Sequence, residues 1–333
     1  MATNARAHYL LIWLAWDVEI SNDTLVPVRR QIEDLVQLPR KRVTVDVWLE
    51  SPGGNAHSAY KLALLLKHVA GHVRVVIPDY AKSAATLLAL AGNEIYLAPS
   101  AELGPLDAQM REEGSVGSIS ALNIALAADA VAADAVSLAG TGGAQLLRRT
   151  GLSRAETIRA MLRFSAQFSE PLVRQLDPKT VHHAKQLLRV TARYAERLLD
   201  YMPAARASHV ATQLVENFPT HGFVIDYEAA KDLGLPVKRL ADYDHLDLVR
   251  DVHRFVEDTD FPLIEFTELA QFVQEWEADL DQDDDEETDE TDETEEPEPE
   301  TETEEIDSDG EAQEEDHDSE RDAPESGGIS PGE

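Results

Sequence analysis

The chain of 333 residues contains no cysteine. This absence excludes a disulfide framework, a cysteine-ligated zinc or iron–sulfur site and a thiol nucleophile. Any covalent catalysis must therefore use another side chain, most simply that of serine, threonine, lysine or a carboxylic acid. The absence does not decide between an oxidising and a reducing compartment.

Long hydrophobic runs are also scarce near the N-terminus. The apolar run from Tyr9 to Trp16 is eight residues long and meets Asp17. This is far short of the roughly 20 apolar residues that span a bilayer. No small-residue cleavage signal follows the run. We therefore expect a soluble cytoplasmic protein with no membrane span.

Positive charge is in short supply, with 29 Lys and Arg against 64 Asp and Glu and a formal net charge of −35. The imbalance is local, because residues 281–333 hold 28 acidic residues and a single base, Arg321. Residues 1–280 therefore carry a net charge of only −8. No basic stripe is present to release counterions, so we expect no nucleic-acid partner.

The composition predicts four regions. Residues 1–117 form an α/β core with two functional turns, and residues 118–218 form a helical arm or insertion. Residues 219–280 return to the α/β domain and add end helices. Residues 281–333 lack large apolar side chains and are predicted to be a disordered acidic tail. The tail is interpreted as a solvating extension, with a protein partner as the alternative.

Strand and helix patterns alternate in the first region. Short apolar or alternating runs indicate strands, and apolar residues at helical spacing indicate helices. This order implies right-handed crossovers and a parallel sheet, and so an α/β fold. The predicted strands are 10–16, 43–49, 73–77 and 94–98, and the predicted helices are 22–38, 56–69 and 84–91.

The second region consists of helix formers. Helices are predicted over 121–138, 153–168 and 181–199, with breaks at Gly142, Gly143, Pro171, Pro178 and Pro203. A strand or turn at 221–226 and a short helix ended by Gly234 follow.

Two turns carry the candidate chemistry, because each follows a predicted parallel strand at the sheet edge where ligands bind. The first is Ser51-Pro52-Gly53-Gly54, whose glycines allow bare N–H groups to approach a ligand oxygen. In the second, Ser83 stands at a strand-to-helix turn, where its hydroxyl would be exposed. Either turn alone is typical of ordinary structure. Their combination across one βαβ unit favours an active site.

These motifs resemble those of the serine proteases of the Clp/crotonase superfamily, and most closely the serine dehydrogenase proteinase family. The resemblance covers about residues 9–238. It rests on four segments in order: the glycine turn from Glu50 to Gly54, the segment Ala81–Thr86, the strand and turn from Glu94 to Asp107, and the segment His221–Leu235.

The resemblance implies a Clp/crotonase-like fold and a serine peptidase acting on polypeptides. It implies that Ser83 is the nucleophile and that Gly54 and Ala84 provide the oxyanion N–H groups, with Gly53 shaping the loop. It also implies a homo-oligomer, and no metal or other cofactor is needed for this chemistry.

The general base is left open, because the Clp subunit has a histidine after the next strand and the stretch from Leu103 to Asp107 has none. His221 is the first candidate, since imidazole titrates near neutrality, and Asp226 is a possible orienting group. Lys185 on the helical arm is the alternative. Lys82 and Asp107 are weaker candidates, because side chains of adjacent residues diverge and a turn aspartate is usually structural.

The other histidines are interpreted as surface residues. His57 follows the glycine turn and could face a substrate, but its position favours exposure. His68 and His72 have a metal-ligand spacing interrupted by a glycine, and His182 and His183 are adjacent and diverge.

Two other functions stay open. A crotonase-type acyl-CoA hydrolase or hydratase would share the oxyanion hole without needing the serine. A non-catalytic Clp-fold interaction protein would account for the missing histidine.

Overall fold

A computed structural model describes residues 7–111, 118–218, 220 and 222–278. The chain divides into two compact units, residues 1–282 and 283–333, and every described residue belongs to the first. The predicted tail and His221 therefore lie outside the described residues. The four-region division stays a prediction.

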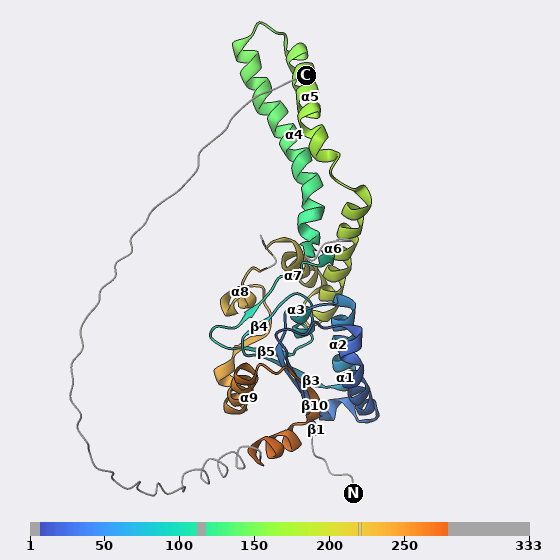
Figure 1. Cartoon of the computed structure of the whole chain (residues 1–333), viewed down its shortest axis with the longest axis vertical. Coiled ribbons are helices and arrows are strands. Elements are labelled where there is room, and N and C mark those ends of the chain that lie inside the picture. The colour runs from blue at the N-terminus through green and yellow to red at the C-terminus, as the bar shows by residue number, and fades with distance from the viewer. Residues whose placement is uncertain (1–6, 112–117, 219, 221, 279–333) are drawn as a thin grey trace, which may run out of the picture. The chain divides into compact units, whose positions relative to one another are not determined.

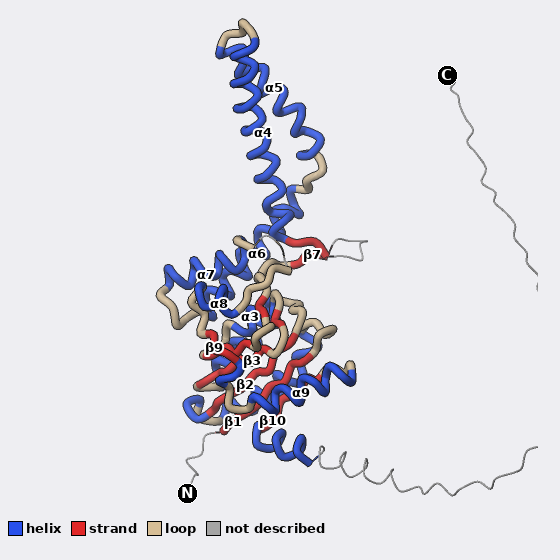
Figure 2. The backbone as a smooth tube through the Cα atoms, turned by 90° about the vertical axis from the view of Figure 1, so that its left-hand side faces the viewer, coloured by secondary structure: helices blue, strands red, loops and turns tan. Residues whose placement is uncertain are grey.

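A six-stranded sheet forms the centre of the α/β part, as Figures 1 and 2 show. Its four inner pairings are parallel, and only the edge strand β10 runs antiparallel to its neighbour β1. The predicted α/β class with a mostly parallel sheet is confirmed. In spatial order the strands are β10 (Leu263–Glu268), β1 (Ala7–Leu14), β2 (Val43–Glu50), β3 (His72–Ile77), β5 (Glu94–Leu97) and β9 (Val237–Arg239).

Helices cover both faces of this sheet. Successive side chains of a strand point to opposite faces, so Leu11 and Trp13 of β1 join one core while Leu10 and Ile12 join the other. The first core includes α1 (Asn22–Asp34), α2 (Ala56–Val69) and α3 (Ala84–Ala89). The second is covered by α9 (Leu246–Thr259). Burial on both faces explains why the strands read as nearly continuous apolar runs.

Four long helices follow the core strands. They are α4 (Ala121–Arg149), α5 (Arg154–Val173), α6 (Pro178–Leu198) and α7 (Ala204–Glu216). In Figures 1 and 2, α4 and α5 lie side by side as a helical hairpin. The short helix α8 (Tyr227–Asp232) precedes β9. The remaining short elements are η1 (Leu35–Gln37), η2 (Arg40–Arg42), η3 (Leu240–Asp242), β4 (Tyr80–Ala81), β6 (Glu102–Leu103), β7 (Gln109–Arg111) and β8 (Ser118–Ser120).

Two of the predicted helix breaks are wrong. Helix α4 continues through Gly142 and Gly143, and α5 continues through Pro171 to Val173. A Cβ atom at Gly142 would lie 2.4 Å from the Met161 Cε atom of α5. This glycine therefore serves close helix packing, and the packing outweighs its low helix propensity. Pro171 lies in the last turn of α5, so the hydrogen bond lost with its missing N–H and the clash of its ring with the preceding turn affect only the end of the helix.

Helix α4 is the one described helix that is long and apolar enough to cross a membrane, by length and composition alone. Its most apolar 18-residue window has a mean hydropathy of 1.5, and 17% of that window is buried. A single helix of this kind is weak evidence for a span, because core helices have the same composition. The expected absence of a membrane span stays a prediction.

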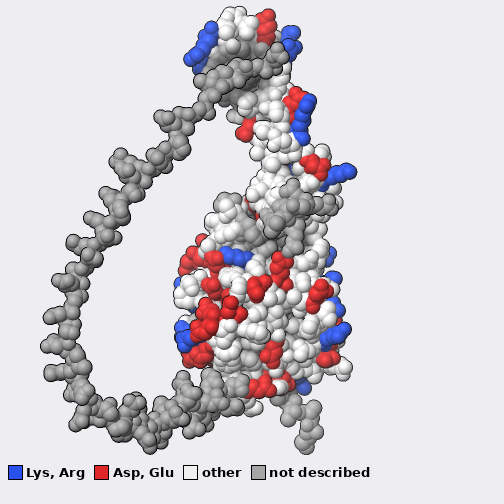
Figure 3. Space-filling model, in the orientation of Figure 1, with Lys and Arg blue, Asp and Glu red and all other residues white. Residues whose placement is uncertain are grey.

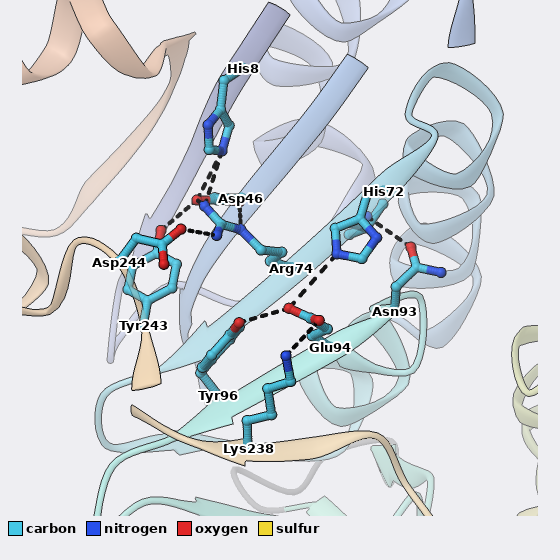
Figure 4. Close-up of polar contacts among 11 residues, drawn as sticks. His8, Asp46, His72, Arg74, Asn93, Glu94, Tyr96, Lys238, Tyr243 and Asp244 are labelled. Carbon is cyan, nitrogen blue, oxygen red and sulfur yellow. Dashed lines mark hydrogen bonds and ion pairs between the residues drawn. The ribbon is translucent and has the colours of Figure 1, made fainter. Parts of the chain in front are cut away.

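A buried ionic network joins the sheet to the segment before α9 (Figure 4). Asp46 of β2 is fully buried and accepts two hydrogen bonds from Arg74 of β3, at 2.7 and 2.6 Å. The Tyr243 hydroxyl donates to the same carboxylate at 2.5 Å, and the His8 Nε2 atom lies 3.0 Å from it. Asp244 binds the other side of the Arg74 guanidinium at 2.8 Å. Burial raises the pKa of Asp46, but hydrogen bonds and charges from His8 and Arg74 outweigh burial and lower it.

We expect Asp46→Asn to lower the free energy of unfolding at pH 7 by about 3–5 kcal/mol, because it removes the buried partner of the Arg74 charge and leaves only the exposed Asp244 paired with it. The contribution of the ionised Asp46 carboxylate to the free energy of unfolding is complete above the pKa of an unfolded aspartate, about 3.9. It is lost as the pH falls through the lower pKa of Asp46 in the folded protein. The difference in the free energy of unfolding between the wild type and Asp46→Asn should therefore become smaller at acidic pH. Urea unfolding at pH 7 and pH 3 measures it, with the exposed Asp200→Asn as the control. A difference independent of pH would contradict the prediction.

Candidate active site

Two turns meet at the carboxyl end of the sheet, where α/β proteins bind ligands. The glycine turn follows Glu50 at the end of β2, and the serine turn follows Ile77 at the end of β3. The Ser51 N–H donates to the Tyr80 carbonyl oxygen at 3.2 Å, and the Lys82 N–H donates to the Ser51 carbonyl oxygen at 3.0 Å. The backbone thus holds the two turns against each other.

Ser83 occupies a strained position at the start of α3. Its backbone has φ 50° and ψ −114°, a conformation that costs a non-glycine residue of order 1–3 kcal/mol. It is the N-cap residue of α3, yet its side chain makes no capping hydrogen bond. The strain therefore does not serve helix capping. A sharp strand-to-helix turn of this kind exposes the hydroxyl of a nucleophilic serine.

Thr86 stabilises the strained turn from within α3. Its hydroxyl is fully buried, lies 2.6 Å from the Ala81 carbonyl oxygen and 2.8 Å from the Gly104 carbonyl oxygen, and accepts the Gly104 N–H at 3.1 Å. One threonine thus ties both ends of the serine turn to the segment that follows β6. Such support is what keeps an unfavourable backbone conformation in place.

Both glycines have positive φ and face backbone atoms. Gly53 has φ 108°, and a Cβ atom there would lie 2.7 Å from the Lys82 carbonyl oxygen and 2.9 Å from the Ser83 Cβ atom. Gly54 has φ 134°, and its Cβ atom would lie 2.5 Å from the Ile20 carbonyl oxygen. The Ile20 N–H donates to the Gly53 carbonyl oxygen, and the Ile20 carbonyl oxygen accepts the Asn55 N–H, both at 2.7 Å. The intervening Gly54 N–H takes part in neither of these two bonds.

A small cavity of about 120 Å³ lies at the junction of the turns. Apolar side chains of α3 and α6 form much of its wall, so a bound group would be partly shielded from water. The lining residues include Gly54, His57, Ser83, Ala84, Leu87, Leu187 and Val190. The N–H of Ala84 belongs to the first turn of α3, where backbone N–H groups lack intrahelical acceptors.

The predicted base candidates are dispersed. His221 lies outside the described residues, so its place is not given. Lys185 lies on α6 but forms an ion pair with Asp129 of α4 at 3.3 Å. Asp226 is the N-cap of α8 and accepts the Ala229 N–H at 2.8 Å.

The two weaker candidates also have structural partners. Lys82 is paired with Glu102. Asp107 is buried and accepts the Leu122 N–H at 3.0 Å, at the start of α4.

His57 is a residue whose part in the site the sequence analysis did not favour. It is exposed, as expected, but it lines the same cavity as Ser83. Its Nδ1 atom lies 2.8 Å from the Tyr194 hydroxyl of α6. The available signal in the sequence is its position three residues after Gly54. Tyr194, 137 residues away, gives no such signal.

A second ionic group ties α9 to the base of the glycine turn. The His253 Nε2 atom lies 2.6 Å from the Glu50 Oε2 atom, and His253 Nδ1 lies 3.5 Å from Glu257. Burial lowers the pKa of His253, but the hydrogen bond and charge of Glu50 outweigh burial and raise it. Burial and the charges of Glu50 and nearby aspartates raise the pKa of Tyr80 to about 12. This group supports the strand end rather than the cavity.

Acidic side chains gather over the α/β part on the face drawn in Figure 3. Within the described ranges no group of three His, Asp or Glu side chains is arranged to hold a metal ion. Ser83, Gly54 and Ala84 line one cavity, and a serine hydroxyl near backbone N–H groups is a combination suited to acyl transfer.

Comparison with known sequences gives two partial matches, both to proteins of Methanocaldococcus jannaschii. Uncharacterized protein MJ1495 is 34% identical over 93 residues, which is 28% of this chain and 29% of that protein. Uncharacterized protein MJ0137 is 39% identical over 66 residues, 20% of this chain and 23% of that protein. The chain thus spans less than a third of the length of either relative.

Solved structures to which the chain is similar include a mutant of the 1510-N membrane-bound stomatin-specific protease, at 14% identity and a TM-score of 0.41 over 74% of this chain and 84% of that one. They also include ClpP1 from Listeria monocytogenes, at 13% identity and a TM-score of 0.36 over 71% of this chain and 94% of that one.

The family model that matches the chain is that of the ClpP-like SDH-type serine proteinases, over residues 18–139. The match contains the glycine turn, the serine turn and the parallel strands that position them. Over residues 18–139 the chain is therefore similar to the ClpP-like SDH-type serine proteinases.

Proposed function

We propose that the chain is a serine peptidase that cleaves polypeptides through an acyl-enzyme on Ser83. The observation that carries the proposal is the strained Ser83 backbone, held against the glycine turn by two hydrogen bonds and supported by Thr86. A strained N-cap residue whose side chain makes no capping hydrogen bond is difficult to explain by stability alone.

In the proposed reaction the Ser83 Oγ atom attacks the carbonyl carbon of the scissile peptide bond. The N–H groups of Gly54 and Ala84 stabilise the oxyanion, and the close approach of Gly53 to Lys82 and Ser83 keeps the two donors together. The C–N bond then breaks, and the amine leaves with one proton. Water hydrolyses the resulting ester and restores the serine.

The apolar wall of the cavity supports a substrate side chain of apolar character next to the scissile bond. Leu187 and Val190 of α6 and Leu87 of α3 contribute to this wall. Endopeptidase action, homo-oligomerisation, a cytoplasmic location and a protein partner for the acidic tail are further parts of the proposal. They rest on the family resemblance and composition rather than on contacts in the described residues.

Turnover of two substrate classes tests this function. We expect hydrolysis of casein and of short peptide esters with an apolar residue before the scissile bond, and stoichiometric labelling of Ser83 by a fluorophosphonate. Acyl-CoA hydrolysis or hydration without labelling would instead identify a crotonase-type enzyme. The absence of both activities and of labelling would identify a non-catalytic interaction protein.

A further inference from the structure

Among the described residues that line the cavity at Ser83, His57 is the only imidazole. Of the described residues that line it, the polar ones besides Ser83 are asparagine, glutamine and threonine, which do not titrate, and His57. Histidine is the side chain whose ordinary pKa suits general base catalysis at neutral pH. The serine and an imidazole thus share one wall of a cavity of about 120 Å³.

Backbone hydrogen bonds hold His57 next to the glycine turn. Asn55 is the N-cap of α2, and its Oδ1 atom accepts the Ser58 N–H at 3.0 Å. The Asn55 N–H in turn donates to the Ile20 carbonyl oxygen at 2.7 Å, next to Gly54. The imidazole therefore stands on the first turn of a 14-residue helix that begins directly after the glycine turn.

Tyr194 orients the ring. The His57 Nδ1 atom and the Tyr194 hydroxyl lie 2.8 Å apart, and the two rings meet edge to face at 77°. Tyr194 is itself stacked on Tyr60 with a centroid distance of 3.9 Å. When Nδ1 donates its proton to the tyrosine oxygen, Nε2 carries the lone pair and can accept a proton. A second group that fixes the tautomer of the base is a regular part of such catalytic arrangements.

His57 also lines a wider and more open hollow of about 680 Å³, with Lys61 and Tyr194 among the other lining residues. The side chain therefore borders both the serine cavity and a more open hollow. This position allows its proton to equilibrate with solvent between turnovers.

We propose that His57 is the general base that activates Ser83, with Tyr194 as its positioning residue. The proposal rests on the proposed peptidase function. His57 Nε2 takes the Ser83 hydroxyl proton as the Oγ–C bond forms and gives it to the nitrogen of the departing amine. It then takes a proton from the attacking water and returns it to Ser83 Oγ as the ester bond breaks.

The rate of Ser83 acylation by a fluorophosphonate, followed by mass spectrometry from pH 5.5 to 9, tests the proposal. We expect His57→Gln to lower the rate 10²- to 10⁴-fold, the usual contribution of a general base, and to remove the neutral limb of the pH profile. His68→Gln, on the same helix and exposed, should keep the wild-type rate and profile. Added imidazole should partly rescue His57→Gly.

The neighbouring charged groups allow this pH limb to be assigned. Tyr60 and Lys61 of α2, Tyr194 of α6 and Arg197 beside Tyr60 are the ionisable groups around the ring, and Glu19 lies across Gly54. None of these neighbouring groups is a histidine. Tyr194→Phe keeps the ring stacking and removes the hydroxyl, so it should shift the pH profile and lower the rate about tenfold, as expected for a positioning residue.

Two results would overturn the proposal and are distinguishable. If Ser83 is labelled in wild type but His57→Gln reacts at the same rate with the same pH profile, His57 is not the base and the peptidase function stands. A large loss in His221→Ala with none in His57→Gln would assign the role to His221. If Ser83 is not labelled in wild type, both this proposal and the proposed function fail.

Discussion

Ser83→Ala is expected to lower the turnover number for peptide hydrolysis on the order of 10⁴- to 10⁶-fold, because it removes the proposed nucleophile. The fold should survive the change. The Ser83 side chain makes no capping hydrogen bond, so its removal costs less than the loss of a true cap. Steady-state hydrolysis and thermal unfolding of the same preparation measure the two effects.

Ser153→Ala is the matched control, because it is expected to lower stability without changing hydrolysis. Ser153 forms a capping box with Glu156 at the start of α5. Its loss should lower the free energy of unfolding by about 1 kcal/mol and leave hydrolysis unchanged. Hydrolysis at the wild-type rate in Ser83→Ala would contradict the role of Ser83.

Gly53→Ala is expected to lower the turnover number for peptide hydrolysis by about 10²- to 10³-fold, the size of the loss of one oxyanion donor. The added Cβ atom would lie 2.7 Å from the Lys82 carbonyl oxygen and 3.1 Å from the Ala84 nitrogen. The serine turn must therefore move away, and the Ala84 N–H moves with it. The left-handed φ of 108° adds strain of about 1–3 kcal/mol, so the melting temperature should also fall.

Gly151→Ala is the control that separates the steric effect of a Cβ atom at Gly53 from the effect of replacing any glycine by alanine. A Cβ atom at Gly151 would meet no heavy atom within 4 Å, so this variant should keep its activity. Gly54→Val should also abolish hydrolysis, because its Cβ atom would collide with Ile20 at 2.5 Å. Full activity in Gly53→Ala would show that the glycine turn has no part in catalysis.

Local patterns in the sequence predicted much of the core. The helix predicted over 56–69 is observed as Ala56–Val69, and the strand predicted over 43–49 is extended by one residue to Glu50. Both depend on contacts close in sequence. Because parallel neighbouring strands end at the same edge, their order was also enough to bring Gly53 next to Ser83.

The rest depended on contacts between distant segments. The edge strand β10 pairs with β1 across more than 250 residues, and α4 passes through Gly142 because α5 packs there. The Asp46–Arg74 network and the His57–Tyr194 contact join residues 28 and 137 positions apart. No local pattern encodes such pairs.

The sequence by itself therefore determined the α/β class and the two turns, since each follows from short-range periodicity and strand order, whereas the role of Ser83 as the candidate nucleophile is what the family resemblance implies. Only the tertiary structure decided which ionisable side chains approach that nucleophile. It placed Lys185 against Asp129, used Asp226 as a helix cap and brought His57 to the cavity wall. The physical reason is that a side chain's neighbours across a fold are set by helix packing, which residue spacing along the chain does not specify.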